Sequence, residues 1–164
     1  MKKRTLILLP GLLALALAGR GEDLIKIETS VTPLRLARGE EGRIILKIAV
    51  RPGIAISPQP SFLVEFDAGP ELIFPKNFFT APDLGIPLVD AGGKERLDLS
   101  KPVEVSFTVG PKAPRGIHRL EGRVRYFGIS AREGWCYKGT AKFSVTFSTR
   151  ISAAPSTDRG GPTR

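Results

Sequence analysis

The chain has 164 residues, a formal net charge of +9 and a single cysteine. One cysteine excludes a disulfide cycle completed within the chain, because thiol–disulfide exchange needs a second, resolving thiol. The positive charge would favour acidic partners or anionic surfaces, but it is spread along strand-like segments and not gathered in one block. The sequence therefore does not predict nucleic-acid binding.

Residues 1–18 have the pattern of a cleaved signal peptide. Three cations at positions 2–4 precede an apolar run that ends on the small-residue pattern Ala16-Leu17-Ala18. The run is shorter than the roughly 20 residues that span a bilayer, so an uncleaved anchor is the weaker alternative. We expect a periplasmic or secreted mature chain, with no stable membrane span after cleavage.

The rest of the chain is long enough for one domain with its own core. We assign residues 19–150 to that domain. Residues 151–164 are rich in Ser, Thr, Pro and Gly and predict a disordered tail.

Apolar residues alternate with polar ones along most of the domain, which is typical of half-buried β-strands. The alternation predicts strands, in chain order, at 24–31, 43–50, 62–66, 97–99, 103–109, 120–126 and 143–147. Turn sequences rich in Gly and Pro separate these runs. The pattern predicts an all-β fold, an immunoglobulin-like antiparallel β-sandwich, with a closed barrel as the alternative.

The connection from Phe74 to Arg96 is unusually long. Loops of this length in compact domains are either functional or disordered. Its apolar content argues against disorder, so we expect it to fold over one end of the sandwich and close the core.

The order of several features resembles the amino-terminal periplasmic domain of the thiol:disulfide interchange protein DsbD and its relatives, called disulfide-bond corrector domains. The features are 33–42 and the strand after it, the turn at 51–58, Phe74-Pro75, the segment 113–122, and 126–137 with its Tyr126 and Cys136-Tyr137. The resemblance covers nearly all of residues 24–149.

This resemblance implies a periplasmic sandwich that passes electrons from a membrane-embedded reductant to oxidised clients. In the family, two cysteines on the final hairpin do the chemistry beneath an aromatic cap. Cys136 matches the second cysteine, whereas Gly128, Ile129 and Ser130 occupy the place of the first. We take Cys136 as the candidate catalytic thiol. The candidate binding aromatics are Tyr126, Trp135, Tyr137, Phe78 and Phe79.

Two functions remain open. The first is a periplasmic accessory to thiol–disulfide interchange or cytochrome maturation, without complete turnover, whose partner is a thioredoxin-like protein or a membrane electron carrier. The second is a redox-inactive immunoglobulin-like module that holds a protein partner through a sheet edge or the 74–96 loop. Neither needs a cofactor, and His118, the only histidine, favours a structural role over metal ligation.

Overall fold

The computed structural model describes residues 24–67 and 69–150, and it contains no helix within them. No segment of these residues could therefore cross a membrane as a helix. The expected signal peptide at 1–18 and the expected tail at 151–164 lie outside the described residues.

One sheet has four antiparallel strands in the order β1-β3-β10-β6. The strands are β1 (Ile25–Thr32), β3 (Glu41–Val50), β10 (Val103–Val109) and β6 (Leu72–Ile73). They correspond to the strands predicted at 24–31, 43–50 and 103–109, with β6 added at one edge.

The other sheet has six strands, with β2-β12-β11-β5-β7 in order and β4 also pairing with β11. The strands are β2 (Arg35–Ala37), β4 (Ile54–Ile56), β5 (Leu63–Asp67), β7 (Phe78–Thr80), β11 (Gly116–Ser130) and β12 (Cys136–Arg150). Among the strands of residues 24–67 and 69–150, only β2 is parallel to its neighbour. A separate hairpin joins β8 (Leu88–Asp90) to β9 (Glu95–Leu97).

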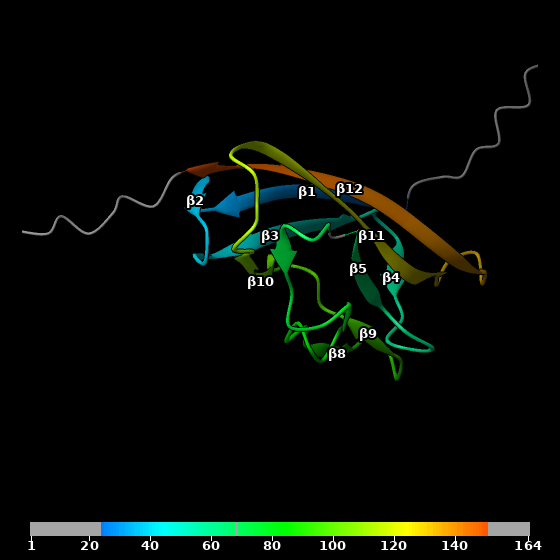
Figure 1. Ribbon diagram of the computed structural model, residues 1–164. Helices are drawn as coiled ribbons and strands as arrows, with labels where there is room; N and C mark the ends of the chain where they lie inside the picture. The colour runs from blue at the N-terminus through cyan, green and yellow to red at the C-terminus, as the bar shows by residue number, and fades with distance from the viewer. Residues whose placement is uncertain (1–23, 68, 151–164) are drawn as a thin grey trace, which may run out of the picture.

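The strand order confirms the predicted immunoglobulin-like sandwich. Immunoglobulin constant-type domains place strands A, B, E and D in one sheet and C, F and G in the other. Here β1, β3, β10 and β6 take the first four places, and β5, β11 and β12 take the last three. Figure 1 shows the two layers, with β1 and β12 running side by side along one margin.

The core forms because the alternating residues of both sheets face one another. Ile44, Leu46 and Val105 come from the first sheet, and Val124 comes from the second; each is almost fully buried. Burial of one such side chain contributes roughly 1.5–3 kcal/mol. Aromatic rings join the layers, since the ring centroids of Phe107 and Phe147 are 5.6 Å apart.

The 74–96 connection closes the core, as its apolar content predicts. It supplies β7 and β8, and it buries Phe79, Ala81 and Ile86. The ring of Phe79 stands edge-on to Phe66 at a centroid distance of 6.0 Å.

Candidate functional site

The long hairpin of β11 and β12 builds the most distinctive surface of the protein. The two strands pair without a break in register from Gly116 opposite Thr149 to Ile129 opposite Cys136. Buried residues alternate with solvent-facing ones on both strands. One set of side chains therefore enters the core, and the other forms the outer face of the six-stranded sheet.

Ser130 shapes the turn of this hairpin. Its N–H donates to the carbonyl of Trp135 at 3.1 Å, and its carbonyl accepts the N–H of Gly134 at 2.9 Å. Its hydroxyl accepts the N–H of Glu133 at 3.2 Å. Gly134 has a φ of 72°, which favours glycine. The turn places Cys136 at the first position of β12.

Cys136 is exposed and unpaired. It lies opposite Ile129, which in turn lies opposite Ala55 of β4. Gly128, Ile129 and Ser130, which the resemblance to DsbD would put in place of a first cysteine, belong to the facing end of β11. The structure thus leaves the sulfur accessible to solvent; the reactivity of the thiol remains a prediction.

Two of the candidate aromatics flank the thiol. Trp135 is half-buried and its indole N–H donates to the Glu133 carboxylate, while Tyr137 is 44% exposed. Tyr126 is only 2% exposed and its ring covers Gly139. Tyr126 therefore contributes to the core near the turn end of the hairpin, opposite Gly139.

Phe78 and Phe79 lie elsewhere. Phe79 is in the core, and Phe78 is exposed on β7 opposite Glu65, which lies opposite Arg123. Arg123 and Ile129 are six positions apart on β11, a displacement of about 20 Å along the strand. These two aromatics are thus not brought to the thiol. The β8–β9 hairpin lies near that end instead, where Ala91 and 94–96 share a depression of about 180 Å³ with Ile129 and Ser130.

His118 has a structural environment. Its Nε2 is 2.9 Å from both the Pro114 carbonyl and the Thr149 hydroxyl, and its ring stacks on Phe147 at 5.1 Å. Within residues 24–67 and 69–150, no group of three or more His, Cys, Asp or Glu side chains could hold a metal ion.

Cations dominate the outer face of the six-stranded sheet. We call this surface the cationic face; its cations are Arg119, Arg123, Arg125, Lys138 and Lys142, and its carboxylates are Glu65, Asp67 and Glu121. Sequence reasoning noted the net charge but missed its concentration here. The alternation of charged residues, three of them Arg, with Leu, Gly and Val from 119 to 125 is the signal that could have revealed it.

Glu65 partly neutralises the cationic face. It accepts a hydrogen bond from Arg123 at 2.6 Å and another from Arg125. The hydrogen bond from Arg123 is the main reason that the pKa of Glu65 lies below its usual value; the charges of both arginines add to it, and partial desolvation opposes it. Lys138 and Lys142 make no ion pair with any residue that the structure describes.

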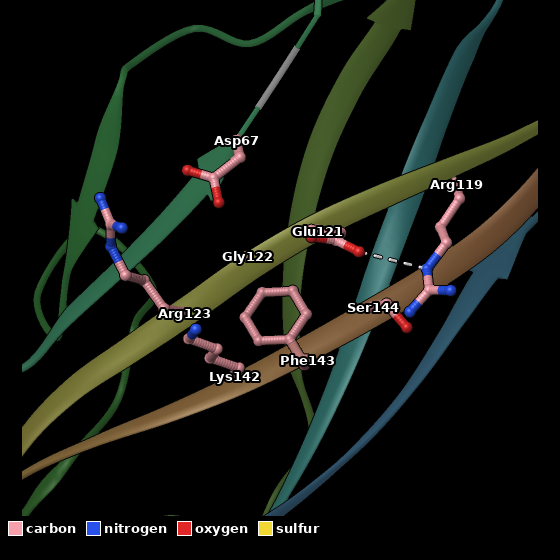
Figure 2. A pocket seen from close by; sticks show the side chains of 8 residues that line it. All are labelled: Asp67, Arg119, Glu121, Gly122, Arg123, Lys142, Phe143 and Ser144. Atoms are coloured by element: carbon pink, nitrogen blue, oxygen red, sulfur yellow. Dashed lines mark ion pairs between the residues drawn. The ribbon is translucent and has the colours of Figure 1, made fainter.

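Like charges face one another across neighbouring strands of the cationic face. Arg123 lies directly opposite Lys142, and Asp67 lies directly opposite Glu121. Like charges directly opposite repel, and here the ion pairs of Arg123 with Glu65 and of Glu121 with Arg119 offset part of that repulsion, whereas Lys142 has no ion pair among the described residues. Both like-charge pairs line a shallow depression of about 360 Å³, shown in Figure 2, where the Arg119–Glu121 ion pair at 3.4 Å flanks the same hollow.

Gly122 and Phe143 form the floor of this depression. A Cβ at Gly122 would lie 2.5 Å from the Phe143 ring and 2.7 Å from the Glu65 carbonyl oxygen. The absence of a side chain at 122 therefore lets the Phe143 ring pack beneath the charged rim.

No family model matches the chain, and no curated protein matches it in sequence. Among solved structures, a type I cohesin from Pseudobacteroides cellulosolvens superposes with a TM-score of 0.45 and 12% identity, covering 79% of this chain and 95% of the cohesin. The major pilin subunit BcpA of Bacillus cereus superposes with a TM-score of 0.42 and 7% identity, covering 77% of this chain. This chain spans 40% of that pilin. By its own strand order, the protein is an immunoglobulin-like sandwich.

Proposed function

We propose that this chain is a protein-binding module whose contact surface is the cationic face and whose partner is an acidic protein. One observation carries the proposal: the cationic face sets Lys142, which has no ion pair among the described residues, directly opposite Arg123 at the rim of the depression. Functional sites commonly retain arrangements that reduce stability.

The arrangement suits an acidic partner. Arginine donates fixed, paired hydrogen bonds to carboxylates, and Lys142 and Lys138 have no partner of their own among the described residues. A surface of one dominant sign speeds the encounter with a partner of the opposite sign and suppresses wrong partners. The signal-like segment at 1–18 adds that the encounter takes place outside the cytoplasm.

A binding experiment with a defined acidic probe tests this function. Fluorescent poly-L-glutamate is titrated with the purified chain, and anisotropy is followed at low and high salt. The double variant Arg119→Glu with Lys142→Glu should lose binding. The control Lys47→Glu with Lys112→Glu changes the net charge equally but alters exposed positions outside the cationic face, and it should retain binding. Equal weakening by both doubles would mean that only net charge matters and would refute the proposal.

The exposure of Cys136 favours a second candidate, the thiol accessory implied by the DsbD resemblance. The Cys136 thiolate would attack a partner disulfide, forming a mixed disulfide and releasing the partner's other sulfur as a thiolate. A thiol from another molecule would then have to release the partner. The module would act as a transient carrier and not as a complete oxidoreductase.

Trapping under native conditions tests this candidate. Cells producing the chain are quenched with acid and alkylated, and disulfide-linked adducts are separated without reductant. A defined adduct that disappears on reduction and is absent from Cys136→Ser supports the thiol role. Rapid native alkylation of Cys136 with no adduct would leave the thiol accessible but without a redox function.

A further inference from the structure

We propose that the outer edge of β12 binds an extended acidic segment of the partner by adding it as a further strand of the sheet. This inference rests on the proposed function and names the form in which the acidic partner is recognised. It concerns the edge of β12, whereas the proposed function concerns the whole cationic face.

Within the described residues the edge has no hydrogen-bonded strand partner over most of its length. On the side away from β11, β2 pairs with β12 only at Ser148, Thr149 and Arg150. From Cys136 to Phe147, no strand of the described chain pairs with that side. A strand edge left unpaired is a template for another strand.

Three hydrogen bonds show which backbone groups face the open edge. The Ser144 carbonyl accepts the Thr29 hydroxyl at 2.7 Å, and the Ser148 N–H donates to the Leu34 carbonyl at 3.0 Å, both on the outer side. The Trp135 carbonyl instead accepts from Ser130 on the β11 side. Backbone direction alternates along a strand, so the even-numbered residues of β12 present their N–H and C=O groups to the edge.

β1 shields only part of this edge. Thr29 lies beside Ser144, and β1 runs in the same direction as β12 (Figure 1). The start of β1 at Ile25 therefore reaches about the level of residue 140, so β1 lies alongside Lys142 and Ser144, and only the stretch from Cys136 to Thr140 is free of β1 among the described residues. The backbone groups of Lys138 and Thr140 are accordingly the most accessible.

Charge selects the strand that can be added. Side chains of a strand added along Cys136 to Thr140 would lie beside Lys138 and diagonally from Lys142; both lysines are exposed and make no ion pair within the described residues. Opposite charges on facing strands attract, and like charges repel. Acidic residues at alternate positions of the partner segment could form ion pairs with both lysines.

The same lysines exclude a second copy of this chain. An antiparallel pair of β12 edges centred on Thr140 would place Lys138 of each copy opposite Lys142 of the other. Lysines on open edges protect proteins from pairing with unintended strands. Here they would reject basic and self-complementary strands while admitting acidic ones.

The test uses a synthetic peptide of alternating Glu and Val, with a Lys–Val peptide as the charge control. Two further Glu–Val peptides carry backbone N-methyl groups, one on every Glu and the other on every Val. Only one of these sets of N–H groups can face β12, so one methylated peptide should lose binding and the other should keep it. Equal binding of the two methylated peptides would overturn strand addition.

Amide hydrogen exchange of the chain supplies a second readout. The amides of Lys138 and Thr140 should exchange quickly in the unbound chain and slow on adding the Glu–Val peptide, whereas the amide of Ala141, directed to β11, should be slow in both states. The double variant Lys138→Glu with Lys142→Glu should lower the affinity for the Glu–Val peptide by about tenfold or more, whereas Lys112→Glu should leave that affinity unchanged.

These outcomes separate the two proposals. If poly-L-glutamate binds through the cationic face but the β12 amides stay unprotected with the peptide, strand addition is wrong and the binding function stands. If neither probe binds, both proposals fall.

Discussion

Asp83 organises the connection that closes the core. Its Oδ2 accepts the Thr80 N–H at 3.0 Å and the Thr80 hydroxyl at 2.8 Å, and its Oδ1 accepts a hydrogen bond from Lys76. These contacts fix the turn that follows β7 and allow Ile86 to return to the core. The Asp83 carboxylate thus holds the exposed turn after β7 in the conformation that lets Ile86 pack in the core.

We predict acid sensitivity from Asp83. The hydrogen bond from Lys76, followed by those from Thr80, lowers the pKa of Asp83 from 3.8 to about 2. Because the pKa is depressed in the folded state, the stabilisation is present above the unfolded value of about 3.9 and is lost as pH falls toward 2. An NMR titration should give this pKa directly.

Asp83→Asn provides the comparison for that prediction. Urea unfolding measured from pH 5 to pH 2 should show a smaller loss of stability in Asp83→Asn than in the original chain. Glu28→Gln, at an exposed position of β1, serves as the control. Identical pH dependence in the original chain and Asp83→Asn would contradict the assignment.

Gly122→Ala should be strongly destabilising for so small a change. The added Cβ would meet the Phe143 ring and the backbone carbonyl of Glu65, and the carbonyl cannot move without disturbing β5. Overpacking of this kind costs about 1–3 kcal/mol. The urea midpoint should fall with little change in slope, whereas Thr140→Ala, at an exposed position of β12, should leave the midpoint nearly unchanged.

At the scale of elements, the register of β11 with β12 places Lys142 opposite Arg123, an arrangement that lowers folding stability but favours binding of an acidic partner. Lys142→Glu would convert its like-charge contact with Arg123 into an ion pair. We expect stability to rise by about 0.2–1 kcal/mol, while poly-L-glutamate binding weakens. Thermal unfolding and anisotropy on the same samples measure both effects.

Lys142→Gln separates the two contributions to that change. It removes the repulsion without adding attraction, so its stability should fall between those of the original chain and Lys142→Glu. A Lys142→Glu variant that is less stable than the original chain would argue against the repulsion.

The sequence predicted the long elements and missed the short ones. Alternation over 43–50, 103–109 and 143–147 identified β3, β10 and the core half of β12 because every second residue is buried. β2, β4 and β6 have two or three residues each, too few to show a period. Their pairing depends on tertiary contacts that no local pattern reports.

The candidate site was predictable only in part. The place of Cys136 on the last hairpin was expected from the resemblance, and the structure puts it at the first position of β12. The positions of Phe78 and Phe79 could not be predicted from the sequence, because the path of a long connection depends on how it packs against the rest of the domain. The cationic face was also missed, since the facing of Arg123 with Lys142 depends on the register between strands.

For the whole molecule, distant strands must meet before the core can form. β1 pairs with β3 and β3 with β10, and β2 joins β12 at the far end of the domain. Proteins dominated by such nonlocal pairings fold in about milliseconds to seconds. Stopped-flow fluorescence of Trp135, the only tryptophan, should give a main phase in this range.

Far-ultraviolet circular dichroism checks that Trp135 does not report on the hairpin alone. The two signals should change together if the sandwich folds as one unit. A microsecond phase carrying most of the Trp135 amplitude would show that the β11–β12 hairpin forms before the rest.

The parallel contact of β2 with β12 has a mechanical consequence. β1 begins and β12 finishes at opposite extremities of the sandwich (Figure 1). Tension applied between Leu24 and Arg150 would pull β2 and β12 in opposite directions along their length. The hydrogen bonds between these two strands would then be loaded in shear and all at once. Rupture would then require a larger force than unzipping one bond after another.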